Sequence, residues 1–359
     1  MIHDKSCLTM AEIDLKQISG LMSVKLGKPI VLTASEKVGS GYHSDGFKLT
    51  AQDGTCYFLK YIKSHDLGFE FPERRIASLH VSDGMNRRAQ NSPAALGVIV
   101  SDQGKAIMLP ELTETTQVYE IQEYGEGDSV SYSKILADNI SKTHVDDEDR
   151  TRLEAIADLL VKIHSHKHPA TDPQRLAAVY NDGIRNMLTN PELSVMVLSE
   201  FPNDYQILDL DGQKEIIGLM YENIKAWMGR SDRLTALHGD FWGANIFFRP
   251  DGTCWVIDFS RIPWGDPAID AGWFMSQFLW YYHSTGNPYF RELIDAWLDI
   301  YGKKSGDEEL LKAIPLVLGW IGIVQIYPRW FPDIDVKIGR KFINHIKDIL
   351  KQKRFVWDD

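Results

Sequence analysis

Short runs of apolar and β-branched residues, separated by turn residues, fill the first third of the chain. This pattern is typical of β-strands joined by tight turns. An amphipathic helix at 8–26 precedes the strands, and a second helix at 70–81 follows the third strand. The pattern predicts an antiparallel sheet of five strands with one inserted helix. The strands are expected at 30–38, 47–49, 56–62, 96–100 and 106–109.

After about residue 112 the apolar positions recur with a helical period instead. Asp266 and Pro267 have the residue types preferred at the N-cap and first position of a helix. We therefore predict an α+β protein with an N-terminal lobe at 1–112 and a larger, mainly helical C-terminal lobe at 113–359. Besides the helix that begins near Pro267, helices are expected at 133–140, 150–164, 174–188 and 213–228, and further ones up to about residue 350.

Composition narrows the class of protein. The chain has 359 residues, and its formal net charge of −11 argues against a nucleic-acid binder, which needs a basic surface. The same charge is compatible with a cationic substrate. The three cysteines are far apart, so neither a disulfide framework nor a zinc site is indicated. No signal peptide is evident, and the longest apolar run, 314–327, is too short to cross a membrane. A cytoplasmic protein without a membrane segment is expected.

The most informative stretch runs from His238-Gly239-Asp240 through Asn245 to Asp258. Two apolar runs flank Pro250-Asp251-Gly252, which predicts a β-hairpin. With a two-residue loop, Asn245 lies directly opposite Asp258, and their oxygens suit a hard cation such as Mg²⁺. If Pro250 imposes a three-residue loop, the register slips by one residue.

Other signals have both a structural and a functional interpretation. The turn Gly39-Ser40-Gly41 could simply close a hairpin, or let backbone approach phosphates. Lys60, inside an apolar strand, could lie on a solvent-facing edge, or pair with Glu73 or Glu70 and bind phosphate.

Two clusters favour the structural interpretation. His164, His166 and His168 favour histidines that are solvated or interact with the helix C-terminus over a metal site. The aromatic cluster of Trp273, Phe274, Phe278, Trp280, Tyr281 and Tyr282 favours core packing over a cation cage.

Taken together, the motifs resemble the aminoglycoside phosphotransferase/choline kinase superfamily over roughly residues 35–345. They are His238-Gly239-Asp240-x-x-x-x-Asn245, Ile257-Asp258-Phe259 and Gly265-Asp266-Pro267-x-x-Asp270. The resemblance implies a bilobal, protein-kinase-like fold. It also implies that Asp240 is the catalytic base and that Asp270 braces the catalytic loop.

The resemblance further implies a nucleotide site. Asn245 and Asp258 would hold Mg²⁺, and Lys60, positioned by Glu73, would contact the phosphates of ATP. The turn at Gly39, Ser40 and Gly41 would approach these phosphates. The backbone around Pro110-Glu111-Leu112 would receive the nucleobase, with GTP as the alternative donor.

The function predicted is transfer of the γ-phosphate of ATP to a hydroxyl of a small molecule. Aminoglycosides, choline or ethanolamine, and sugars are the candidate acceptors. One rival is a protein kinase, against which the His-Gly-Asp loop and the missing Ala-Pro-Glu segment argue. The other is an inactive nucleotide-binding module, against which the presence of Asp240, Asn245, Asp258 and Lys60 argues. The sequence predicts no oligomeric state.

Overall fold

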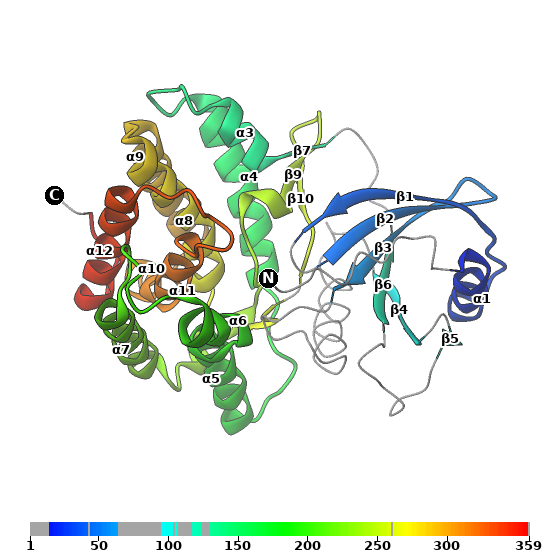
Figure 1. Ribbon diagram of the computed structural model, residues 1–359, viewed down its shortest axis with the longest axis horizontal. Coiled ribbons are helices and arrows are strands. Elements are labelled where there is room, and N and C mark those ends of the chain that lie inside the picture. The colour runs from blue at the N-terminus through cyan, green and yellow to red at the C-terminus, as the bar shows by residue number, and fades with distance from the viewer. Residues whose placement is uncertain are drawn as a thin grey trace. The chain divides into compact units, whose positions relative to one another are not determined.

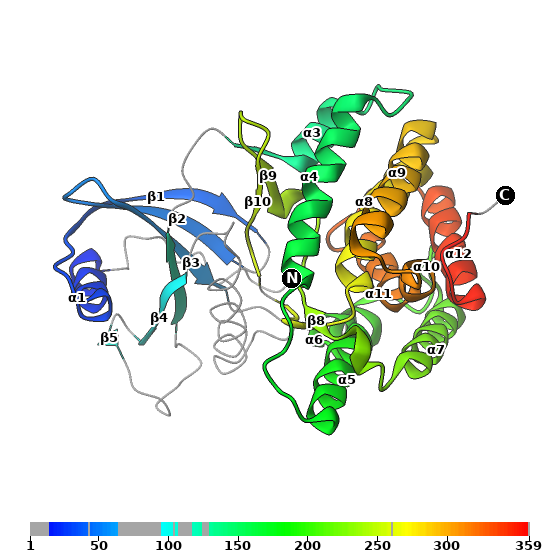
Figure 2. The same ribbon diagram turned by 180° about the vertical axis from the view of Figure 1, so that it is seen from behind.

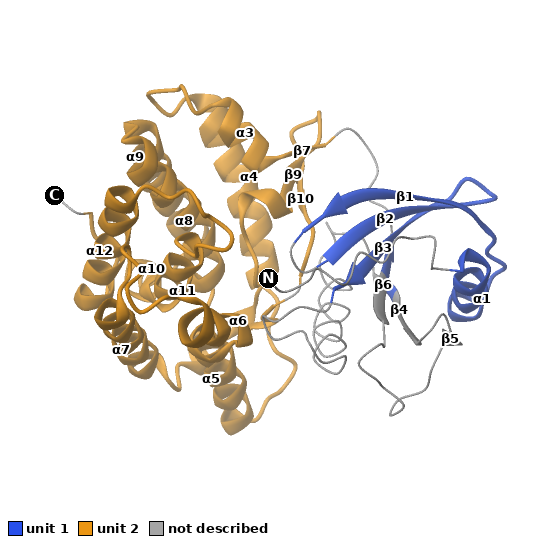
Figure 3. Cartoon of the chain, in the orientation of Figure 1, with its two compact units in different colours: residues 1–127 blue, residues 128–359 orange. Residues whose placement is uncertain are grey.

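The computed structural model divides the chain into two compact units, residues 1–127 and 128–359 (Figure 3). It describes residues 14–41, 44–63, 95–102, 105–106, 117–123, 129–259 and 261–357. For residues 95, 97–102, 105–106, 117–120 and 123 it describes the backbone alone.

In the first unit the described strands form one antiparallel sheet with the order β1-β2-β3-β6-β4-β5 (Figure 1). Helix α1 begins at Leu15, where the Asp14 side chain accepts the backbone N–H groups of residues 16 and 17. The strands are β1 (Leu32–Ser40), β2 (Ser44–Ala51), β3 (Cys56–Ile62), β4 (Ala95–Asp102), β5 (Lys105–Ala106) and β6 (Gln117–Glu123); the helix is α1 (Leu15–Leu26).

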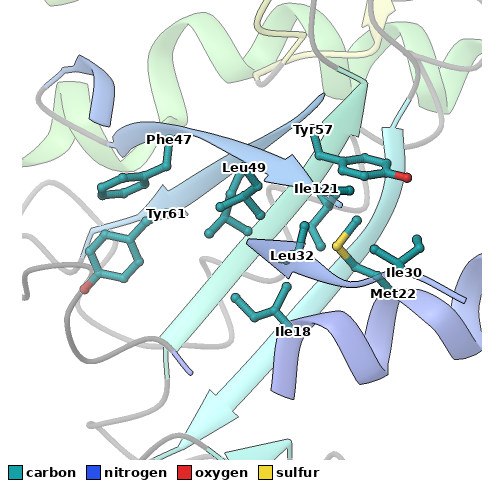
Figure 4. Packing of buried hydrophobic residues seen from close by; sticks show 11 residues of the cluster. Ile18, Met22, Ile30, Leu32, Phe47, Leu49, Tyr57, Tyr61 and Ile121 are labelled. Carbon is teal, nitrogen blue, oxygen red and sulfur yellow. The ribbon is translucent and has the colours of Figure 1, made fainter. Parts of the chain in front are cut away.

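The core of this unit lies between α1 and one face of the sheet (Figure 4). Apolar residues alternate along β2 and β3, so every second side chain points toward α1. Leu49 and Leu59 are completely buried there. The cluster comprises Ile18, Met22, Ile30, Leu32, Phe47, Leu49, Ala51, Tyr57, Leu59, Tyr61 and Ile121.

Strand β6 is the main difference from the expected sheet. Five strands were predicted, but the described residues form six, and β6 lies between β3 and β4. Its sequence, QVYEIQE, is rich in Glu and Gln, which favour helix in isolation. Pairing with strands on both sides overrides that preference. The division between the units follows β6, whereas the sequence placed it at residue 112.

The predicted helix at 70–81 lies outside the described residues. The helices expected near 133, 150, 174, 213 and 267 are all present in the second unit (Figures 1 and 2). The helices there are α3 (Tyr132–Asp138), α4 (Asp147–His164), α5 (Pro173–Thr189), α6 (Pro191–Val195), α7 (Leu210–Trp227), α8 (Ala268–Thr285), α9 (Pro288–Ser305), α10 (Leu310–Ala313), α11 (Pro315–Gln325) and α12 (Val336–Gln352), with a π-helical turn η2 (Met196–Glu200) and 3-10 turns η3 (Ser231–Arg233) and η4 (Gly243–Asn245).

Helices α8 and α11 form the centre of the second unit. Residues 268–279 of α8 and 315–323 of α11 are buried, and the two helices pack against each other. The aromatic residues Trp273, Phe274 and Phe278 lie in this core, which confirms their structural interpretation. Among the described residues, no helix combines the length and apolarity needed to cross a membrane.

The short strands of this unit carry the motif residues. They are β7 (Val130–Ser131), β8 (Thr235–Ala236), β9 (Ile246–Phe248), β10 (Cys254–Val256) and β11 (Trp264–Gly265), paired as β10-β9-β7 and β11-β8.

The β9–β10 hairpin has the register of the three-residue loop. Phe248 pairs with Cys254, and the N–H of Ile257 donates to the carbonyl of Asn245 at 3.0 Å. Gly252 has φ +82°, the left-handed conformation that follows a type I turn in such loops. Asn245 therefore lies opposite Ile257. The placement directly opposite Asp258, derived from a two-residue loop, is wrong.

Helix α5 packs closely on β11, which leads into the Gly265-Asp266-Pro267 motif. A Cβ atom at Gly183 would lie 2.1 Å from the carbonyl oxygen of Trp264. We expect Gly183→Ala to lower the free energy of unfolding by about 1–3 kcal/mol, because backbone must move. Gly218→Ala in α7, where a Cβ would meet nothing within 4 Å, is the control and should stabilise by ~0.5–1 kcal/mol. Urea unfolding measures both; equal effects of the two changes would contradict the packing argument.

Candidate active site

The loop after β8 is held by a buried carboxylate in the first turn of α8. Asp270 is fully buried, and it accepts the backbone N–H groups of His238 at 2.7 Å and Gly239 at 2.9 Å. His164 lies 3.1 Å from the same carboxylate through Nε2 and 2.8 Å from the hydroxyl of Tyr301 through Nδ1. Asp270 thus has the bracing contacts that were predicted for it.

Gly239 is required by this geometry. Its φ is +82°, and a Cβ would lie 2.6 Å from the backbone nitrogen of Ile262. A side chain would therefore be strained in conformation and would collide with neighbouring backbone.

His238 links this loop to the end of β10. Its Nε2 donates to the carbonyl of Ile257 at 2.8 Å, and its Nδ1 accepts the N–H of Asp240 at 3.2 Å. This pair of bonds fits the neutral ring. Burial is the main cause that lowers the pKa of His238, while the charge of Asp270 acts in the opposite direction.

Both carboxylate oxygens of Asp240 have a partner. The amide of Asn245 donates to Oδ2 at 3.1 Å and to the Asp240 carbonyl at 2.9 Å. The Nε of Arg261 lies 3.4 Å from Oδ1. Because the Asn245 nitrogen faces Asp240, its oxygen points away and is available to another group.

Asp258 has an unusual backbone conformation. Its φ is +67°, and among the described residues only Lys353 is another non-glycine residue with positive φ. Such strain concentrates at functional sites, where the surrounding structure enforces it. It also matters for the side chain, because the hairpin register alone would aim residue 258 to the face opposite Asn245. The charge of Asp258 acts to raise the pKa of both His238 and Arg261.

A family model described as the phosphotransferase enzyme family matches residues 36–311, more than half of the chain. The chain belongs to the phosphotransferase enzyme family. No curated protein matches it.

The fold of this phosphotransferase is shared by solved structures of low sequence identity. One is a thermostable mutant of aminoglycoside phosphotransferase APH(4)-Ia in ternary complex with ADP and hygromycin B. It is 14% identical over 93% of this chain and 98% of the other, with a TM-score of 0.51. Another is a Plasmodium vivax ethanolamine kinase, 13% identical over 89% of this chain and 84% of the other, with a TM-score of 0.54. The similarity confirms the predicted protein-kinase-like fold.

In the first unit of the phosphotransferase, the glycine turn is stabilised by Asp45. The Ser40 hydroxyl donates to Asp45 at 2.6 Å, and Lys37 and Lys63 each form an ion pair with it at 3.1 Å. Burial alone would raise the pKa of the Asp45 carboxyl, but these three partners hold it below its usual value.

The fold itself does not require glycine at the predicted phosphate turn. A Cβ at Gly39 would meet nothing within 4 Å, and the nearest atom to a Cβ at Gly41 would be 3.7 Å away. Neither residue has a positive φ.

Lys60 lies in β3, where its register partners are Gly46 in β2 and Glu120 in β6. Its neighbours Leu59 and Tyr61 point into the α1 core, so Lys60 points to the opposite face of the sheet. The other nucleotide-site predictions, Glu73 with its rival Glu70, and Glu111 and Leu112 at the hinge, lie outside the described residues.

Sequence reasoning missed two parts of the site. It assigned no role to Arg261, which contacts both Asp240 and Glu192. It also treated His164 as solvated, although His164 is buried against Asp270. His166 does contact the end of α4, as predicted. The only available signal for His164 was its place on the apolar face of α4.

The side chains near Asp240 supply only some of the ligands that a hard cation needs. Among the described residues, no group of three or more His, Cys, Asp and Glu side chains could hold a metal ion. Asn245 and Asp258 offer two oxygen donors, which fits Mg²⁺ because this ion takes most of its remaining ligands from phosphate and water.

The neutral state of His238 predicts a pH dependence of stability. Since its pKa is lowered in the folded state, the unfolded chain takes up the proton first as the pH falls below about 6.5. The unfolding free energy of the wild type should then fall relative to His238→Gln, by up to about 1.4 kcal/mol per pH unit. Urea unfolding of both proteins between about pH 7.5 and 5 measures this difference. A difference that is constant with pH would show that His238 takes up its proton equally in both states.

Proposed function

We propose that the protein transfers the γ-phosphate of ATP, in the presence of Mg²⁺, to a hydroxyl group of a small molecule. The observation that carries this proposal is the arrangement around Asp240. Its carboxylate is held between Asn245 and Arg261, on a loop braced by Asp270, with the strained Asp258 close by. Membership of the phosphotransferase enzyme family supports it. GTP is the alternative donor.

Asp240 is the proposed catalytic base. Phosphoryl transfer passes through a loose transition state, so the acceptor hydroxyl needs orientation first and loses its proton late. A carboxylate with both oxygens held in place suits the first task, and its remaining lone pairs can accept the hydroxyl hydrogen bond. Asp240 then accepts the proton as the new O–P bond forms.

Asn245 and Asp258 are the proposed ligands of Mg²⁺, through the amide oxygen and the carboxylate. A bound magnesium ion would neutralise charge on the nucleotide phosphates. The amide nitrogen of Asn245 meanwhile holds Asp240, so this one side chain serves both the base and the metal site.

The first unit is proposed to bind the nucleotide. Lys60, positioned by Glu73 or Glu70, contacts the phosphates, and the backbone of Gly39, Ser40 and Gly41 approaches them. The room for a Cβ at Gly39 supports this, because the fold does not explain the glycine.

The nucleobase was predicted to bind near Glu111 and Leu112. Glu111 and Leu112 lie outside the described residues, and they stay the proposed contacts of the nucleobase.

The acceptor is proposed to be a small hydroxylated molecule that carries an amine. The two structural neighbours support this class, because one was solved in complex with hygromycin B and the other is an ethanolamine kinase. The formal net charge of −11 also favours a cationic acceptor.

We expect Asp240→Asn to lower kcat by about 10²–10⁴-fold, the usual contribution of a general base. Nucleotide binding should persist, because Asp240 faces the acceptor. A coupled assay over aminoglycosides, amino alcohols, sugars and nucleosides identifies the acceptor, and calorimetry measures Mg·ATP binding. Acceptor-dependent turnover that survives in Asp240→Asn would exclude this base. Nucleotide binding without transfer to any acceptor would instead favour the inactive module.

We expect Asp258→Asn to raise the Mg²⁺ concentration for half-maximal rate on the order of tenfold, the factor that about 1.4 kcal/mol of binding free energy gives. Asp251→Asn is the matched control, because Asp251 lies in the same hairpin and its carboxylate accepts hydrogen bonds from Thr253, the one partner it has in the described part of the chain. Magnesium titrations of the transfer rate compare the two variants. An equal response would remove Asp258 from the metal site.

A further inference from the structure

Arg261, which the function proposed above does not use, lies among charged and aromatic groups. Only 22% of its side chain is exposed. Its Nη1 contacts the carboxylate of Glu192, and its Nε lies 3.4 Å from Oδ1 of Asp240. Its guanidinium carbon lies 5.6 Å and 5.4 Å from the ring centres of Trp273 and Trp320.

The two indoles form a corner rather than a flat surface. Their ring centres are 4.7 Å apart and their planes are inclined at 84°. An aromatic corner lined by carboxylates is the arrangement that binds a cationic ligand. Here the cation is a residue of the chain itself, so this corner is not the amine subsite of the acceptor.

A purely structural role explains only part of this arrangement. Glu192 on α6 is 5% exposed, and such a buried carboxylate needs a charged partner. Arg261 supplies one through Nη1, and that pair alone would satisfy Glu192. It leaves the second contact unexplained, in which Nε lies 3.4 Å from Oδ1 of Asp240.

We propose that Arg261 is a positioning residue for Asp240, held in place by Glu192 and by the faces of Trp273 and Trp320. This inference rests on the proposed function, because it assigns Asp240 the role of base. Arg261 itself is placed against Asp240 and acts through it.

The geometry explains how the positioning works. The carboxylate of Asp240 can rotate about its last torsion unless both oxygens are held. Asn245 donates a hydrogen bond to Oδ2 and Arg261 forms an ion pair with Oδ1, so both oxygens of the carboxylate are restrained. Arginine suits this task better than lysine, because its planar fork reaches two carboxylates and also packs on indole faces.

Burial alone would lower the pKa of Arg261, but the charges of Glu192, Asp240 and Asp258 outweigh burial and raise it. The guanidinium therefore stays charged throughout the pH range of an assay. Its charge is shared by carboxylates from α6, from the loop after β8 and from the end of the β9–β10 hairpin.

The test separates kcat from KM. We expect Arg261→Ala to lower kcat about 100-fold, the cost of misplacing a reacting group by about 1 Å, while both KM values stay close to wild type. Millimolar methylguanidinium should restore part of kcat by filling the vacated corner. Arg261→Lys keeps the charge without the fork, so it should lose kcat with KM retained. If Arg261→Ala does not fold, the comparison of kcat and KM is made with Arg261→Lys instead.

The matched control is Arg233→Lys. Arg233 is also buried between two carboxylates, Asp266 and Asp307, and against the ring of Trp227, with no contact to Asp240 among those described. We expect a lower melting temperature, unchanged kcat and no response to methylguanidinium. If Arg261→Lys behaves like Arg233→Lys, the role of Arg261 is only structural and the proposal is wrong.

A double-mutant cycle on stability separates this inference from the proposed function. Urea unfolding of wild type, Arg261→Lys, Asp240→Asn and the double variant reports the Arg261–Asp240 contact without any turnover. Non-additive changes support the contact, and additive changes overturn it. If the cycle is non-additive but wild type transfers phosphate to no acceptor, the proposed function fails while the contact stands.

Discussion

The site depends on one buried carboxylate, that of Asp270. A fully buried carboxylate is costly unless donors surround it. Here the donors are the backbone N–H groups of His238 and Gly239 and the ring of His164. They belong to the loop after β8 and to α4, so one side chain in the first turn of α8 ties three segments together. The first turns of α8 are buried in the core, so the loop after β8 is anchored to a tightly packed part of the structure.

Further contacts connect the loop that Asp270 holds to Asp240. The ring of His238 joins the backbone of Asp240 to the carbonyl of Ile257, so the loop and the hairpin end are fixed to each other. Asn245 and Arg261 then hold the carboxylate itself. The charges of Glu192, Asp240 and Asp258 all act on one guanidinium, that of Arg261.

The structure differs from the sequence-based expectation in two places, the register of the β9–β10 hairpin and the surroundings of Trp273 in α8. The three-residue turn shifts the hairpin by one residue, and Asp258, just beyond it, has a positive φ that is rare for a residue with a side chain. The aromatic residues of α8 were weighed as core or cation cage. Trp273 belongs to the core and also faces a cation, but that cation is Arg261.

The sequence by itself determined what depends on neighbours along the chain. Helical periodicity located α4, α5 and α7, the residue types at Asp266 and Pro267 located α8, and motif spacing singled out Asp240, Asn245, Asp258 and Asp270. Only the tertiary structure decided the place of β6 in the sheet and the contacts of Arg261 and His164. Arg261 meets Glu192 across 69 residues and Asp270 meets His164 across 106. Contacts of that kind depend on the whole backbone path, whereas periodicity and turn chemistry act within a few residues.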